Sequence, residues 1–208
     1  MKVVVPARVN GCRWRQLSRQ VVTDHWMGFG VTLVFADDGG EVFSRGGSIN
    51  SAVRHLPDNE IVVAADADIL ADFDAVEQAI EMARDGGLVQ PFDRVQYLDE
   101  SWTRIEWDFE ATTATPLFGG LNVFSVDTWR QAGGFLRQFR GWGCEDVAFA
   151  YQCAVMVAPT RRVEATVTHL WHPKTGEFAA ANNGDVLADV VAATTREELQ
   201  EVLNVLSA

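Results

Sequence analysis

Cysteine and basic residues are scarce in this sequence. The 208 residues include three cysteines, Cys12, Cys144 and Cys153, and none of them forms a Cys-x-x-Cys pair. An odd number without a disulfide pattern favours a reducing compartment. Lys and Arg number 17 against 29 Asp and Glu, which gives a formal net charge of -12. This balance excludes a nucleic-acid backbone as a partner, and it means that an anionic substrate would need a bound cation.

Long apolar runs are also absent. No stretch reaches the roughly 18 apolar residues of a membrane span, and the run before Pro6 is too short for a signal peptide. We therefore expect no membrane span and a cytoplasmic protein. Hydrophobic residues nevertheless make up 48% of the chain, enough for the core of one ordinary domain. Seven tryptophans are many for this length, and spare aromatic rings are common on surfaces that face sugars.

Short apolar strands alternate with helical patterns in the first half of the sequence. Residues 3–5, 31–35 and 61–65 read as strands, and residues 14–26, 48–56 and 72–84 read as helices. This alternation predicts βαβ units and an α/β domain with a mostly parallel sheet. The later half is less regular, with strands expected at 88–91, 121–126 and 163–170 and helices at 127–132, 145–155, 185–193 and 195–206.

Charged residues follow each of the first three expected strands. Pro6-Ala7-Arg8 follows the first, Asp37-Asp38 the second, and Asp66-Ala67-Asp68 the third. Ligands of such sheets bind at the carboxyl ends of the strands, so these residues predict a common site. The pair Asp66 and Asp68 suits Mg²⁺ or Mn²⁺, which would bridge a diphosphate. Alone, the pair is equally typical of a solvated turn in which one Asp caps a helix.

Three later segments carry further candidate groups. His169-Leu170-Trp171-His172 offers two imidazoles, either of which could complete a metal shell with Asp68, and both also fit ordinary surface or core positions. Gly141-Trp142-Gly143-Cys144-Glu145-Asp146 places two acids at a helix start, where one could serve as a general base or both could simply offset the helix dipole. Phe118-Gly119-Gly120 is either a turn or a close approach of backbone to a sugar.

Taken in order, these segments resemble the β-1,4-galactosyltransferase family of GT-A glycosyltransferases. The resemblance runs from Val3 to about His172 and rests on segments similar to the family's motifs: Val4-Val5-Pro6-Ala7-Arg8, Phe43-Ser44-Arg45-Gly46-Gly47-Ser48-Ile49-Asn50, Asp66-Ala67-Asp68, Phe118-Gly119-Gly120-Leu121, Gly133-Gly134-Phe135 and Gly141-Trp142-Gly143-Cys144-Glu145-Asp146. The last segment is the most specific. The implied fold is one Rossmann-like GT-A domain over residues 1–178, with a twisted mixed sheet, followed by a helical tail over 179–208.

The resemblance also implies roles for individual residues. Asp146 would be the catalytic base and Glu145 an acceptor-site acid. Asp68 would be the main metal ligand with His169, which we expect in preference to His172, and Asp66 would also contribute to the metal site. Together with the residues at the strand ends, the motifs predict the following contacts to the nucleotide sugar: Pro6, Arg8, Asp37, Asp38, Arg45, Asn50, Asp66, Gly119, Gly120 and Trp142.

The resemblance thus predicts an inverting, metal-dependent transfer of galactose, N-acetylgalactosamine or glucose. The donor would be a UDP-sugar, the cofactor Mn²⁺ or Mg²⁺, and the acceptor a hydroxyl of a carbohydrate or a glycosylated protein. The sequence departs from the family at Val147, where a third acid is usual, and at Cys144, which replaces a glycine. Acceptor choice should lie in residues 92–116 and in the tail, where the resemblance is weakest.

Three alternatives remain open at this point. A retaining enzyme like the related polypeptide N-acetylgalactosaminyltransferases shares parts of the pattern, although the Glu145-Asp146 pair favours inversion. A sugar nucleotidyltransferase would need a Gly-rich phosphate loop, of which residues 6–11 are a poor version. A non-catalytic module that binds nucleotide sugars would not require Asp68, Asp146 and His169 together.

Overall fold

The computed structural model describes residues 1–8, 11–112, 117–141, 143–173 and 180–207. A six-stranded sheet lies at its centre, with strand order β2-β1-β3-β8-β5-β9. Strands β1, β2 and β3 are parallel, whereas β8 runs antiparallel to both β3 and β5. The strands have these bounds: β1 Lys2–Pro6, β2 Leu33–Ala36, β3 Ile61–Ala65, β5 Val89–Gln90, β8 Leu121–Ser125 and β9 Arg161–Arg162. The sheet is mixed, as the sequence predicts.

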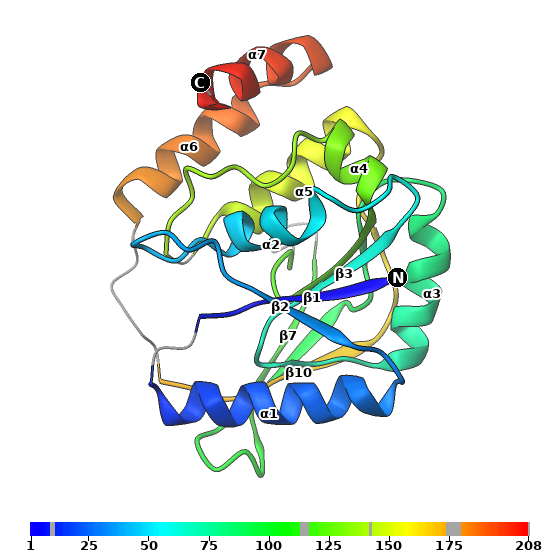
Figure 1. The fold of residues 1–208 in the computed structure, drawn as a ribbon, viewed down its shortest axis with the longest axis vertical. Coiled ribbons are helices and arrows are strands. Elements are labelled where there is room, and N and C mark those ends of the chain that lie inside the picture. Colours follow the sequence, from blue (N-terminus) through cyan, green and yellow to red (C-terminus); the bar gives the residue numbers. More distant parts are fainter. Residues whose placement is uncertain (9–10, 113–116, 142, 174–179, 208) are drawn as a thin grey trace.

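Helices cover both faces of this sheet (Figure 1). Alternation within β1 decides the faces, because Val3 and Val5 pack with the helices α1 and α3, while Val4 packs with α2 and α5. The helices of the two faces have these bounds: α1 Arg13–Gly28, α2 Arg45–Val53, α3 Phe73–Ala83, α4 Val126–Gln131 and α5 Glu145–Met156. Among the described residues, none of the helices combines the length and the apolar character needed to cross a bilayer.

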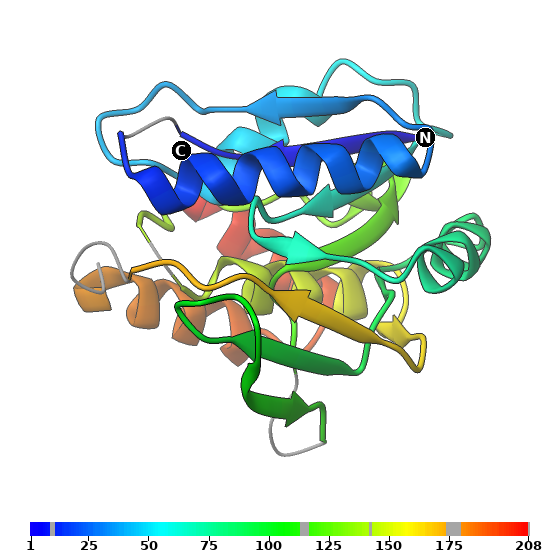
Figure 2. The ribbon, with the colours of Figure 1, turned by 90° about the horizontal axis from the view of Figure 1, so that it is seen from below.

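A second, four-stranded sheet has the order β4-β10-β6-β7. Its strands are β4 Ile69–Leu70, β6 Arg94–Leu98, β7 Ile105–Glu110 and β10 Thr166–His169. The sequence patterns predict no strand between residues 92 and 116, and the hairpin of β6 and β7 corrects this (Figure 2). Every residue of β7 is exposed, so the strand lies outside the hydrophobic core.

The C-terminal helices are α6 Ala180–Ala192 and α7 Arg196–Ser207. They lie at the end of the molecule opposite α1 (Figure 1). Leu199 and Leu203 of α7 and Val190 of α6 form one hydrophobic cluster with Ala148 of α5. The tail therefore packs directly on the helix that carries Glu145 and Asp146.

Candidate functional site

Asp68, His169 and His172 form the group best suited to hold a metal ion. One ligand atom from each lies within 4.8 Å of the others. The pairing of β4 with β10 brings them together, because His169 stands opposite Ile69, and the Leu170 N–H donates to the Asp68 carbonyl over 2.8 Å. The sequence predicts all three residues, and the structure brings both histidines to Asp68.

Hydrogen bonds orient the two imidazoles differently. Nε2 of His172 lies 3.0 Å from Oδ2 of Asp68, while Nδ1 lies 3.1 Å from the carbonyl oxygen of Pro173. If Nδ1–H donates to this backbone carbonyl, Nε2 is the nitrogen that would bind a metal, in place of the proton that it shares with Asp68. Nε2 of His169 is 3.8 Å from Oδ1 of Asp68, and its ring stacks on Tyr97 with centroids 4.8 Å apart.

The charge state of this group also suits a cation. Burial alone would raise the pKa of Asp68, but the hydrogen bond from His172 and the charges of the two histidines outweigh it and lower the pKa. The same hydrogen bond raises the pKa of His172. Asp68 is therefore an anion at neutral pH, as a metal ligand must be.

Asp66 belongs to a second group. Its Oδ1 accepts a hydrogen bond from Nε of Arg45 over 2.5 Å, and Nη1 of the same arginine donates to Oδ1 of Asp146. Arg45 is only 8% exposed, in the first turn of α2, whose N-terminus Ser44 caps. Burial would lower the pKa of Arg45, but the charges of Asp146 and Asp66 raise it instead. The guanidinium is therefore a permanent cation that links the Asp-x-Asp loop to the start of α5.

Asp146 is held by partners from two elements, α2 and β8. Besides Arg45, Nδ2 of Asn122 on β8 donates to its Oδ1 over 3.2 Å. Its Oδ2 faces Gly119, where a Cβ atom would lie 3.2 Å away, and no described residue donates a hydrogen bond to it. Burial, opposed by Arg45 and helped by the charges of Glu145 and Asp66, raises the pKa of Asp146 well above its usual value. The site thus contains a largely buried carboxylate of increased basicity, 13% exposed, with one oxygen available.

The glycines before β8 allow this close approach. Gly119 has no side chain to displace Asp146, and Gly120 has a φ of +93°, which favours glycine. The carbonyl of Gly120 accepts a hydrogen bond from the Asp66 N–H over 2.8 Å. The Phe-Gly-Gly segment therefore lies between the two acids that Arg45 bridges.

The ends of β1 and β2 form an ion-pair cluster. Arg8 donates to both oxygens of Asp37, over 2.9 and 2.6 Å, and to Asp38 over 3.2 Å. The hydrogen bond from Arg8 lowers the pKa of Asp37 to about 2. Pro6, the last residue of β1, is buried beside them. The convergence of these strand ends is therefore confirmed, whereas their contact with a nucleotide stays a prediction.

Asn50 is one of the residues predicted to contact the nucleotide sugar, but its side chain is engaged within the protein. Asn50 is 8% exposed, and its amide donates to the Phe135 carbonyl and accepts from the N–H groups of Phe135 and Trp129. With its hydrogen-bonding groups engaged in this way, Asn50 fixes α2 to the turn before Phe135, and the structure gives it a structural role. Trp142 lies outside the described residues.

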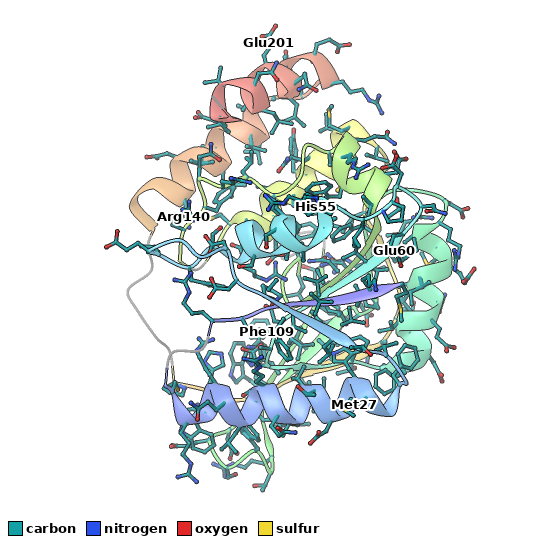
Figure 3. The ribbon with its side chains drawn as sticks, viewed as in Figure 1. Met27, His55, Glu60, Phe109, Arg140 and Glu201 are labelled. Carbon is teal, nitrogen blue, oxygen red and sulfur yellow. The ribbon has the colours of Figure 1, made fainter. Side chains whose placement is uncertain are left out.

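Asn183 of α6 is a site-supporting residue that the sequence analysis misses. It is 2% exposed, and its amide donates to the carbonyls of Arg140 and Gly143, both over 3.0 Å, and accepts from the Arg140 N–H over 3.3 Å. Figure 3 shows Arg140 near the start of α6, close to the loop after β2, where its side chain pairs with Asp38 over 2.9 Å. The tail thus holds the loop that leads into Glu145 and Asp146. A single Asn in a tail rich in Ala and Asn gives no signal of this in the sequence.

We expect Asn183→Ala to destabilise the fold by about 1–3 kcal/mol, because it leaves backbone groups of a buried loop without partners. Urea unfolding measures this difference. Asn204→Ala, at an exposed position of α7, is the matched control and should change stability by no more than about 0.5 kcal/mol. Equal stability of the two variants would show that α6 does not hold this loop.

Known proteins resemble this chain in sequence and in structure. Residues 105–175 match a family model described as the N-terminal domain of galactosyltransferase. The catalytic domain of Drosophila β1,4-galactosyltransferase 7, in complex with xylobiose, is similar in structure, with a TM-score of 0.61 and 17% identity over 90% of this chain and 79% of that one. A mutant of that enzyme in complex with manganese, UDP-Gal and xylobiose gives a TM-score of 0.56 and 14% identity over 88% of this chain and 79% of that one. Comparison with curated proteins finds no match.

The fold is therefore that of GT-A glycosyltransferase catalytic domains, as predicted. Within that class, the resemblance to the β-1,4-galactosyltransferase-like family is confirmed by the family model over residues 105–175, a segment that includes Asp146, His169 and His172. The boundary at residue 178 stays a prediction.

Proposed function

We propose that this chain is an inverting, divalent-metal-dependent glycosyltransferase that moves a sugar from UDP to a hydroxyl of a carbohydrate acceptor. The family model and the GT-A fold support a glycosyltransferase. The similar Drosophila structure that contains manganese, UDP-Gal and xylobiose supports the metal, the donor class and the acceptor class.

One observation carries the proposal: the Asp-x-Asp segment contributes one carboxylate to each of two adjacent groups. Asp68 lies with His169 and His172, and Asp66 is joined through Arg45 to Asp146. Metal-ligand candidates and a candidate base are therefore connected through the backbone of the Asp-x-Asp segment and the two ion pairs of Arg45. A solvated turn with a capping Asp would need neither group.

Asp68, His169 and His172 would hold the metal. One carboxylate with two imidazoles is a softer set than the all-oxygen surroundings that Mg²⁺ prefers, which favours Mn²⁺. When bound, the ion supplies positive charge that stabilises the departing nucleoside diphosphate. It would also offset the negative charge that this acidic chain presents to a diphosphate.

Asp146 would act as the base. Its free Oδ2 takes the proton of the acceptor hydroxyl, whose oxygen forms the new bond to the anomeric carbon while the bond to UDP breaks. Arg45 and Asn122 hold Oδ1 and so fix the direction of Oδ2. Because attack and departure occur on opposite sides of the sugar, a single displacement inverts its configuration. Glu145, buried beside Asp146, would bind the acceptor.

UDP binding should depend on a divalent cation. We expect calorimetry to show clear binding of UDP with Mn²⁺ and a loss of affinity of at least about 100-fold with a chelator. Substitutions of residues that only support the metal ligands typically reduce metal affinity 10–100-fold, and the chelator removes the ion itself. Asp85→Asn, at an exposed turn far along the chain from the site, should behave as the parent protein. Equal affinity for UDP with and without metal would contradict the assignment.

A further inference from the structure

A cavity of about 520 Å³ lies along one side of α5, and its lining includes Val147 and Phe118, which are chain neighbours of Asp146 and Gly119. The helix contributes Val147, Ala150, Tyr151 and Ala154, which are spaced i, i+3, i+4 and i+7 and so share one face. This face begins one residue after Asp146 and extends for about 10 Å at the rise of an α-helix. The cavity lining therefore includes the residue that directly follows the candidate base.

The lining is mainly apolar and the small side chains leave room. Ala150 and Ala154 present only methyl groups, and Val147 is 38% exposed although it is hydrophobic. Val147 also stands where the resembling family has a third acid. An apolar residue at this position removes a hydrogen-bonding partner for a sugar hydroxyl and provides a surface that is favourable only for an apolar group.

Other segments contribute one cation, one aromatic ring and one acid, namely Arg162, Phe118 and Asp93. The guanidinium of Arg162 lies 5.3 Å from the centroid of the Phe118 ring, and both residues line the cavity. Nη1 of Arg162 is buried and has no hydrogen-bond partner among the described residues. A donor in this position is suited to a hydrogen-bond acceptor at the end of an otherwise apolar group.

We infer that this cavity binds the aglycone of the acceptor, and that the aglycone is an apolar, aromatic group with a hydrogen-bond acceptor that faces Arg162. The inference rests on the proposed function, since it makes the acceptor a glycoside rather than a free sugar. Phe118 connects the two sites, because it precedes Gly119, which contacts Asp146. The acceptor sugar would lie at Asp146 and its aglycone along α5.

Calorimetry with paired acceptors tests this inference in the presence of UDP and Mn²⁺. The probes are the methyl and 4-nitrophenyl β-glycosides of xylose, glucose, galactose and N-acetylglucosamine, together with xylobiose. For at least one sugar we expect the 4-nitrophenyl glycoside to bind about tenfold or more tightly than the methyl glycoside, because the ring buries apolar surface. Ala154→Phe, which fills the cavity, should reduce this gain to less than about threefold.

Ala188→Phe is the matched control, since Ala188 is an exposed alanine of α6 outside the cavity, and it should keep the full gain. UDP binding in the same experiments separates the two hypotheses: its loss in all proteins would count against the proposed function, not against the cavity. With UDP bound normally, three results would each overturn the aglycone assignment. These are equal affinities within every pair, tighter binding of xylobiose than of any aryl glycoside, or no binding of any aryl glycoside.

Discussion

Asp146→Asn should reduce turnover by roughly 10²–10⁴-fold, the usual cost of removing a general base. An amide has nearly the shape of a carboxylate but cannot accept the acceptor's proton. The geometry makes this position suitable, because Oδ1 is held by Arg45 and Asn122 while Oδ2 has no hydrogen-bond donor among the described residues. The raised pKa of Asp146, caused first by burial, makes the carboxylate a stronger base.

A loss of folding must be separated from a loss of catalysis. Removing one partner of a buried ion pair can cost about 3–5 kcal/mol, although Arg45 would still be paired with Asp66 in this variant. Titration with UDP in the presence of Mn²⁺ counts the folded sites, so turnover is expressed per UDP-binding site. We expect nearly unchanged affinity for UDP, since Asp146 lies outside the group formed by Asp68 and the two histidines.

Glu145→Gln provides the adjacent control. This variant removes the neighbouring buried acid and should chiefly weaken acceptor binding. Wild-type turnover of Asp146→Asn with an inactive Glu145→Gln would assign the base to Glu145. Unchanged turnover in both variants would refute the inverting mechanism.

The sequence predicts where the site lies in the fold better than it predicts the hydrogen bonds and ion pairs between the site residues. Strand ends place Arg8, Asp37 and Asp66 at one edge of a parallel sheet, and this follows from the order of apolar runs alone. The pairing of Arg45 with both Asp66 and Asp146 joins residues 21 and 101 positions apart, and no local pattern encodes such a contact. Side-chain partners depend on tertiary packing, which is why Asn50 is predicted as a ligand contact but forms part of the support of α2.

The second strand of the β6–β7 hairpin has a recognisable pattern in the sequence. Ile105, Trp107 and Phe109 alternate with acidic residues, which is the two-residue period of a strand. The hairpin has a consequence for the site, because Tyr97 of β6 stacks on Trp107 on one side and on His169 on the other, with centroids 4.2 and 4.8 Å away. A row of rings across three paired strands thereby fixes the orientation of a candidate metal ligand.

Asp68→Asn should weaken Mn²⁺ binding by more than about 100-fold. Changes to the partners of metal ligands typically cost 10–100-fold in affinity, and this substitution removes a direct ligand together with its charge. Calorimetric titration with Mn²⁺ alone measures the effect without any need for turnover. Asp85→Asn, which removes an exposed carboxylate, is the matched control and should bind Mn²⁺ as the parent protein does.

The two histidines can be separated in the same titration. The resemblance favours His169, whereas the structure brings His172 nearer to Asp68 and orients it through Pro173. We therefore expect both His169→Ala and His172→Ala to weaken Mn²⁺ binding, with His55→Ala as the exposed control. A defect confined to one variant would identify the single metal histidine.

The affinity of this site for Mn²⁺ should depend on pH. Asp68 raises the pKa of His172, so the proton that competes with the metal stays bound up to a higher pH than on an ordinary histidine. Affinity for Mn²⁺ should therefore be full at pH values above the raised pKa of His172 and should fall as the pH decreases through it.

If Asp68→Asn and both histidine variants bind Mn²⁺ as the parent protein does, the three residues form only an ion pair, and the metal must be sought elsewhere.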